Sequence, residues 1–228
     1  MALYDRDYTS TEVDYAQEGA SVSFMKTTYQ LLAASMIAAA AGAYVTMPYA
    51  ETVMQYKWFI FGAELLVLFF GLSMSRGKSG LNLAMLFTFT FLSGVSLVPL
   101  LASLIGAGNG AVIGNAFLMT AVLFGALSLF AINSKTDYSS WGKPLFITLI
   151  VVIIASLVNY FLLQSPIMHI VITAGILLLF SFFTIYDTQN IANGAYDSPV
   201  DAAVSLYLDF LNMFTALLQL LGIFGNDD

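Results

Sequence analysis

Two aspartates near the C-terminal end of the chain have the residue type and spacing that could do chemistry. Asp187 lies in "TIYDTQNIA" and Asp209 in "SLYLDFLN", and the polar break "NGAYDSP" separates the two segments. Both positions are equally far from Ser198, so in an antiparallel helical hairpin they lie at similar depth. At 1.5 Å per residue, Asp209 would lie roughly 15 Å from Pro199. The spacing predicts that these two carboxylates, named here the aspartate pair, meet.

A pair of carboxylates in contact offers proton and cation chemistry. The two groups cannot both ionise without cost, so the pair titrates in two coupled steps and shares a proton in acid. Once ionised, the pair would separate or bind a cation, and its oxygen ligands suit calcium in particular. The alternative is that each aspartate only reaches the membrane interface or caps a helix. That alternative is weaker for Asp209, which lies deep in an apolar run.

Other ionisable residues are weaker candidates. Glu64 in "FGAELLVLFF" is a third acidic group inside an apolar run and is expected to face inward. Arg76 could form an ion pair that holds the aspartates together, although basic residues such as Arg76 and Lys78 more often only determine topology. His169 is the only histidine and has no partner at ligand spacing, which favours a helix-end residue over a metal ligand.

The composition places these residues in a membrane. Hydrophobic residues make up 59% of the 228 residues, charged residues only 9%, and the mean hydropathy is +0.85, which indicates one integral membrane domain. The net charge of -7, with only seven Lys and Arg, argues against nucleic acid as a partner. The chain has no cysteine and therefore no disulfide or thiolate metal site. No cofactor is expected, apart from calcium that is transported or transiently bound.

Long apolar runs of about 20 residues, the length of a membrane helix, position the aspartates. We expect an all-α polytopic fold with seven transmembrane helices, at Thr28–Met47, Trp58–Met74, Leu81–Ile105, Ala111–Ile132, Pro144–Leu163, Ile167–Asp187 and Val200–Phe224. The runs do not alternate as the strands of a membrane barrel would. Residues 1–27 are then a polar tail, which lacks the pattern of a cleaved signal, and residues 28–228 form a single seven-helix domain.

The basic residues predict the orientation in the membrane. If the N-terminus is cytoplasmic, six of the seven Lys and Arg lie on the inner side and only Lys57 lies outside. The C-terminal end, with Asp227 and Asp228, is then outside. The last span carries Asp201, Asp209, Asn212 and Gln219. Because lipid cannot satisfy these groups, we expect six helices to be arranged around this central C-terminal helix.

Several pieces of the sequence are similar to a known family. "YDTQNI" followed by "SLYLDFLNMFTALLQLLGIFGN" resembles the C-terminal signature of the Bax inhibitor-1 family, also called the transmembrane Bax inhibitor motif (TMBIM) family, in its bacterial branch. "SGVSLVP", "SLVNYF" and the acidic residue of the second span are also similar, so the resemblance covers essentially everything after residue 20. It implies two three-helix layers around the last helix, in the inner membrane of a bacterium.

The resemblance also implies a function, that of a pH-sensitive calcium leak channel gated by an aspartate dyad. Carried over by position, the dyad is Asp187 and Asp209. In relatives an arginine at the inner end of the second span bonds to the dyad. The best ungapped alignment places Ser75 there and Arg76 one residue later, which turns the side chain by about 100° around the helix. Arg76 is the candidate latch.

Other functions stay open at this point. The same pair could serve a proton-coupled cation exchanger as a proton relay. The protein could also be a non-conducting membrane regulator of proteases or cell-death proteins, although its short loops offer little docking surface. We do not expect an enzyme, because an intramembrane hydrolase needs a Ser–His pair or metal ligands and His169 is isolated. The expected partners are the lipid bilayer, calcium ions and protons, and the sequence identifies no protein partner.

Overall fold

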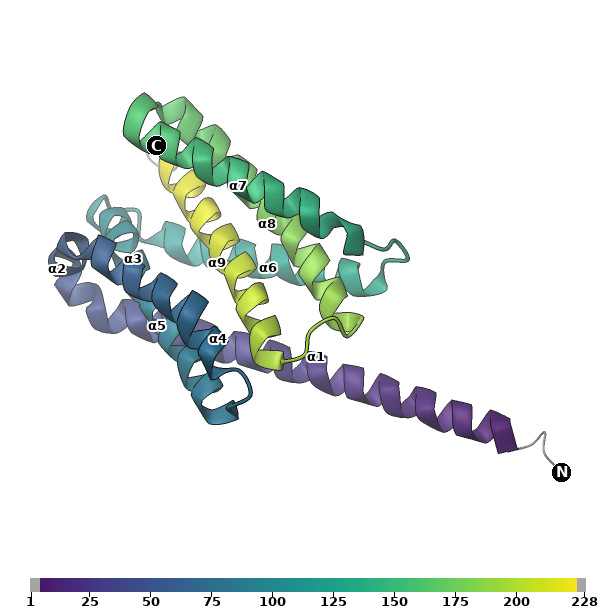
Figure 1. Cartoon of the computed structure of the whole chain (residues 1–228). Coiled ribbons are helices and arrows are strands. Elements are labelled where there is room, and N and C mark those ends of the chain that lie inside the picture. The colour runs from purple at the N-terminus through teal and green to yellow at the C-terminus, as the bar shows by residue number, and fades with distance from the viewer. Residues whose placement is uncertain (1–4, 225–228) are drawn as a thin grey trace.

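The computed structural model describes residues 5–224, with side chains from residue 21 to residue 223, and every regular element in this part of the chain is helical (Figure 1). Seven helices are long: α1 (Asp5–Thr46), α3 (Lys57–Leu66), α5 (Ser79–Gly106), α6 (Ala111–Asn133), α7 (Gly142–Val158), α8 (Pro166–Ala192) and α9 (Pro199–Phe224). The short elements are α2 (Ala50–Gln55), α4 (Leu72–Ser75), 3₁₀ turns at Met47–Tyr49 and Ser139–Trp141, and π-helical turns at Val67–Gly71 and Asn159–Leu163.

Seven helical stretches within the described residues are long and apolar enough to cross a membrane. The second stretch combines α3, a π-helical turn and α4, and the fifth combines α7 with the turns on either side of it. The predicted all-α fold with seven spans is therefore confirmed. Most predicted ends lie within a few residues of the observed ends, but α8 continues past Asp187 to Ala192.

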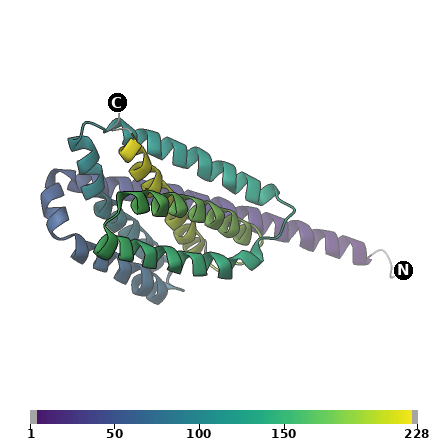
Figure 2. The same ribbon diagram turned by 90° about the horizontal axis from the view of Figure 1, so that it is seen from above.

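The N-terminal region differs from the expected polar tail followed by a span. α1 begins at Asp5, so the described part of that tail is helical and continuous with the first span. Figure 2 shows this part of α1 projecting beyond the other helices. The break expected at "MPYAETVMQYK" is also mostly helical, because a 3₁₀ turn and α2 occupy it. The cytoplasmic position of the tail stays a prediction, and residues 1–4, Asp227 and Asp228 lie outside the described residues.

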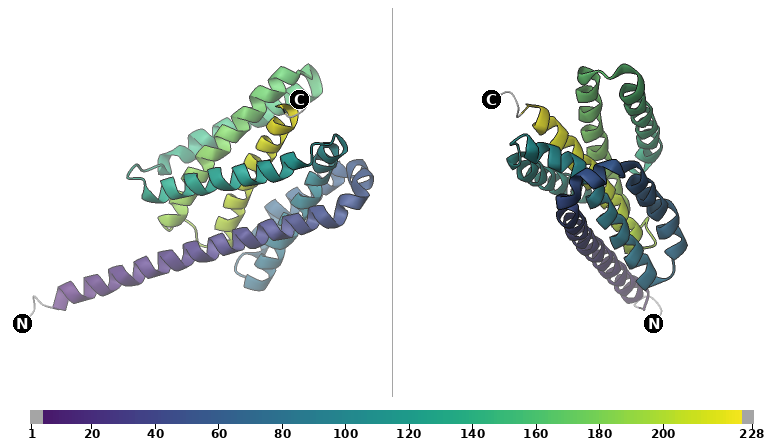
Figure 3. Two further views of the ribbon diagram at one scale, coloured as in Figure 1. Left: turned by 180° about the vertical axis from the view of Figure 1, so that it is seen from behind. Right: turned by 90° about the vertical axis from the view of Figure 1, so that its left-hand side faces the viewer.

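The long helices pack as two groups that α9 joins. α1, α2, α3 and α4 pack against α5 in the N-terminal group, and α6 and α7 pack against α8 in the C-terminal group. α9 packs against α1 and α5 of the first group and against α6 and α8 of the second. From behind, α1 and α6 cross in front of α9 (Figure 3). α9 is the most buried of the seven spans. An arrangement with all six other spans around it stays a prediction.

Glycines allow the tightest contact in the N-terminal group. A Cβ added at Gly94 of α5 would collide with the backbone carbonyl of Ala39 in α1, and one added at Gly42 of α1 would collide with that of Phe91 in α5. Small residues let membrane helices approach at backbone distance, where van der Waals packing replaces the hydrophobic effect as the driving force. α1 and α5 are therefore closely packed together, and α9 packs against both of them.

Candidate functional site

The turn between α8 and α9 brings the aspartate pair together inside the protein. Asp187 lies in α8 and is 8% exposed, and Asp209 lies in α9 and is 2% exposed. Residues 193–198 reverse the chain, and the two helices then pack against each other. The carboxylates are close enough to interact electrostatically. The structure thus places both predicted residues in the buried contact between α8 and α9, while a direct hydrogen bond between them stays a prediction.

Tyr196, in the turn between the two helices, is the hydrogen-bonding partner of Asp187. Its hydroxyl lies 3.0 Å from Oδ1 of Asp187 and 3.0 Å from Oγ of Ser205 in α9. Because a tyrosine hydroxyl carries one proton, it can donate to the carboxylate while it accepts from the serine. Burial, and then the negative charge of Asp187, raise the pKa of Tyr196, so this hydroxyl stays protonated and remains a donor.

Sequence reasoning missed Tyr196 and Ser205. One signal was available, since Tyr196 is the one aromatic residue of the break "NGAYDSP" and lies nine residues from both Asp187 and Ser205. Its side chain could therefore reach either helix.

Asp209 is in a different environment from Asp187. Its Oδ2 atom is buried and has no hydrogen-bond partner among the described residues. Within residues 21–223, neither aspartate of the pair has an ion pair with lysine or arginine. A carboxylate buried without a cation or a donor is costly to ionise, and it holds a proton or binds a cation instead. The pair is therefore a place where a proton and a metal ion would compete.

Hydrogen bonds to the neighbouring loop fix the end of α8 that carries Asp187. The side-chain amide of Gln189 donates to the carbonyl of Thr136 at 2.8 Å and accepts from the backbone N–H of Tyr138 at 2.6 Å. Thr188 also donates to Ser128 of α6 at 3.3 Å. These bonds tie α8 to α6 and to the loop that follows it, so α8 belongs to the C-terminal group of helices.

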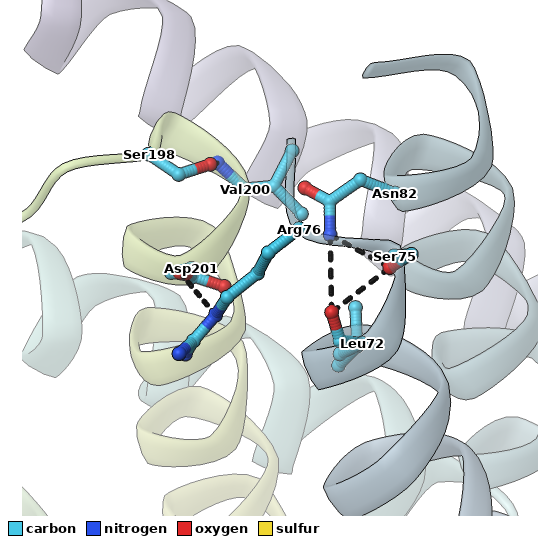
Figure 4. Close-up of polar contacts among 7 residues, drawn as sticks. All are labelled: Leu72, Ser75, Arg76, Asn82, Ser198, Val200 and Asp201. Atoms are coloured by element: carbon cyan, nitrogen blue, oxygen red, sulfur yellow. Dashed lines mark hydrogen bonds and ion pairs between the residues drawn. The ribbon is translucent and has the colours of Figure 1, made fainter. Parts of the chain in front are cut away.

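Arg76 lies near the same end of α9 but binds a different aspartate. Its Nε lies 3.1 Å from Oδ2 of Asp201, in the first turn of α9, and the two side chains are 65% and 23% exposed (Figure 4). Ser75, at the position that aligns with the family's arginine, donates to the carbonyl of Leu72 at 2.9 Å and accepts from Asn82 at 3.0 Å. The structure thus joins Arg76 to α9 without joining it to the aspartate pair, and the role of a latch on the pair stays a prediction.

Glu64 and His169 lie away from the pair. Glu64 is 9% exposed and accepts a hydrogen bond of 2.7 Å from Ser96 of α5, in the N-terminal group of helices. His169 lies near the start of α8, in a cleft that it shares with Gln219 near the end of α9. Glu64 faces inward as expected, but neither residue contributes to the site around Asp187.

The donor atoms around the pair are all oxygen. Two carboxylates and the hydroxyls of Tyr196 and Ser205 make up this set. Hard cations such as calcium prefer oxygen ligands, six to eight of them, so water would have to complete the coordination. Within residues 21–223, no group of three or more Asp, Glu, His or Cys side chains is placed to hold a metal ion. Binding of calcium at the pair stays a prediction.

Comparison with known proteins supports the family suggested by the sequence. The chain is 51% identical over 232 residues to an uncharacterized protein of Helicobacter pylori, with full coverage of both chains. It is 34% identical over 172 residues to the inner membrane protein YbhL of Escherichia coli, covering 71% of this chain and 70% of YbhL. It is 36% identical over 141 residues to the modulator of FtsH protease YccA of Escherichia coli, covering 62% of this chain and 64% of YccA.

The family model described as "Inhibitor of apoptosis-promoting Bax1" matches residues 21–226, which include all seven spans and the aspartate pair. With its seven apolar helices and its similarity to bacterial inner membrane proteins, the chain is an integral membrane protein of the Bax inhibitor family.

Proposed function

We propose that the protein is a pH-sensitive calcium leak channel in which Asp187 and Asp209 form the gate. The observation that carries the proposal is a buried pair of interacting carboxylates with no ion pair to a basic residue. Such a pair responds to the two species that the function requires, because a proton and a calcium ion each neutralise it.

The pH response follows from the charge of the pair. In the closed form a shared proton holds α8 and α9 together. Raising the pH removes that proton, so the closed form loses stability as the pH rises and the two helices part. Two unit charges about 4 Å apart repel by about 4 kcal/mol at an effective dielectric constant of about 20. A tenfold shift between closed and open forms needs only about 1.4 kcal/mol.

Calcium flux into liposomes that contain the purified protein tests this function. We expect passive flux down a calcium gradient, faster at alkaline than at acidic pH, which persists when no proton gradient is applied. Empty liposomes are the control. Proton movement in fixed proportion to calcium would instead support a proton-coupled cation exchanger, and the absence of any flux at both pH values would refute a channel.

A second function is favoured by one of the comparisons. The relative YccA is named as a modulator of FtsH protease, which suggests that this protein regulates a membrane protease as its partner. Degradation of a test substrate by FtsH, in membranes with and without this protein, measures that effect. A change in degradation that survives replacement of both aspartates by asparagine would make protease regulation independent of the proposed gate.

A further inference from the structure

A polar stripe runs along one side of α9 over most of its length. Half-buried residues of this helix lie at Asp201, Ser205, Leu208, Asn212, Thr215 and Gln219. Steps of three and four residues keep these positions within about 40° of a common line at 100° per residue. Five of the six are polar, and the buried Asp209 lies beside the stripe, about 80° from its common line. The other half-buried positions between residues 200 and 223 are apolar: Leu211, Leu220, Leu221 and Ile223.

The rest of α9 is packed and mostly apolar. Ala202, Leu206, Met213 and Leu218 are fully buried. The side opposite the stripe, with Tyr207, Phe210 and Phe214, borders an apolar groove of about 450 Å³ next to α1, α5 and α6. Neighbouring helices therefore cover most of α9, apart from the polar stripe, the side that borders this groove and the last turns of the helix.

The first two polar side chains of the stripe have partners outside α9, since Asp201 pairs with Arg76 and Ser205 bonds to Tyr196. The next two bond only within α9. Asn212 donates to the carbonyl of Leu208 at 2.7 Å, and Thr215 donates to that of Asn212 at 3.1 Å, both within α9. In a membrane, polar side chains usually pair across helices, because an unsatisfied polar group in hydrocarbon is costly. The amide oxygen of Asn212 has no such partner within the described part of the chain, so water is the partner that would satisfy it.

The stripe joins two polar regions. At one end, Ser205 and Asp209 belong to the site around the aspartate pair. At the other end, Gln219 lines a cleft of about 370 Å³, together with Asn159, His169 and Thr173 of the α7–α8 hairpin and Trp58 of α3. Asp209 and Gln219 are ten residues apart, which is about 15 Å along the helix.

We propose that this stripe lines a water-filled path that leads from the aspartate pair to the cleft around Gln219, and that the cation leaves the pair by this route. The proposal rests on the proposed channel function and adds the wall and the outlet of the path. On the predicted orientation of the chain, the outlet faces the outer side of the membrane. The apolar groove on the opposite side of α9 is excluded as a route, since its lining offers a cation almost no polar ligand.

The lack of cysteine in the chain allows a direct test by labelling. Single cysteines are introduced at stripe positions, as Asn212→Cys, Thr215→Cys and Gln219→Cys. Two matched controls are Ala216→Cys, which is buried and lies about 60° from the common line of the stripe, and Val171→Cys, which is exposed on an apolar surface of α8. A charged methanethiosulfonate is added on both sides of the membrane, so the result does not depend on orientation. The cysteine thiolate attacks this reagent, forms a disulfide with it and releases methanesulfinate. The thiolate forms in water rather than in an apolar surrounding.

Mass spectrometry and calcium flux provide two separate readouts. We expect the stripe cysteines to be labelled and, after labelling, to lose most of their calcium flux, while both controls stay unlabelled and keep their flux. Stripe variants that conduct calcium yet resist the reagent at both acidic and alkaline pH would overturn the proposal. Labelled stripe cysteines in a protein that never conducts would leave the water-filled stripe standing but refute the channel. If neither labelling nor flux occurs, in three variants that elute as folded protein, both proposals fail.

Discussion

At the residue scale, the two carboxylates of the site differ in the hydrogen bonds that they accept. Asp187 receives a hydrogen bond from Tyr196, whereas Oδ2 of Asp209 has no partner among the described residues. A hydrogen bond to a carboxylate favours its ionised form, and burial without one favours the protonated form. The two carboxylates of the pair therefore differ in their hydrogen bonding, although both are buried.

Removing the Tyr196 hydroxyl should shift the pH response of the channel. Tyr196→Phe takes a donor from ionised Asp187, so the pair keeps its proton to higher pH and the midpoint of calcium flux moves to more alkaline pH. A hydrogen bond to a charged group contributes about 1.5–3 kcal/mol, which corresponds to about 1–2 pH units. The matched control is Tyr186→Phe, at the residue that precedes Asp187 in α8. A Tyr196→Phe midpoint that stays in place or moves toward acid would contradict this role.

The partner of Arg76 can be identified by a double-mutant cycle. Its ion pair with Asp201 is largely exposed, and such pairs contribute about 0–1 kcal/mol. We therefore expect Arg76→Ala and Asp201→Asn each to change thermal stability slightly, with no further loss in the double variant, and to leave the pH midpoint of flux unchanged. If Arg76→Ala alone moves that midpoint while Asp201→Asn does not, Arg76 acts on the aspartate pair and is the family's latch after all.

At the element scale, the α1–α5 contact and the α8–α9 contact are both extensive but differ in what lies between the helices. α1 and α5 approach at Gly42 and Gly94, where backbone touches backbone. The α8–α9 contact instead contains the aspartate pair, Tyr196 and Ser205, whose bonds change with protonation. Opening should therefore separate α8 from α9 without changing the contact between α1 and α5.

Gly94→Ala should destabilise the protein, because the contact between α5 and α1 leaves no space for an added methyl group. The added methyl group meets the backbone of Ala39, and overpacking of this kind typically costs about 1–3 kcal/mol. The matched control is Gly175→Ala in α8, where an added Cβ meets nothing within 4 Å and alanine favours the helix. Thermal unfolding in detergent should show a lower midpoint for Gly94→Ala only. An unchanged midpoint would mean that α1 and α5 can move apart easily.

Several elements could be predicted from the sequence because their signal is local. The apolar runs gave the seven spans within a few residues at most ends, and symmetry about Ser198 predicted that Asp187 and Asp209 lie near each other. The helical extension of α1 was missed, since a polar segment carries no hydropathy signal. The hydrogen bonds of Tyr196 and the ion pair of Arg76 with Asp201 could not be predicted. They depend on how neighbouring helices are rotated about their axes, and spacing along the chain does not determine that rotation.

At the scale of the whole molecule, α9 joins two groups of helices that touch each other mainly through it. It packs most extensively against α8, and this contact includes the aspartate pair, while its other sides pack against α1, α6 and α5. A change in the charge of the aspartate pair would therefore act at the helix that joins the two groups of helices, where it could change their relative position. Membership of the Bax inhibitor family and the seven-span fold are consistent with such a device, and the gate itself is our central claim.

The pH profile of calcium flux in the Asp187→Asn/Asp209→Asn double variant tests that claim most directly. Asp137→Asn is the matched control, because hydrogen bonds from the backbone N–H and the hydroxyl of Ser139 hold the pKa of Asp137 below its usual value, and this exposed carboxylate stays ionised throughout. We predict a flatter profile for each single variant, no pH dependence for the double variant, and a wild-type profile for Asp137→Asn. A folded double variant that keeps the wild-type pH profile would contradict the gate.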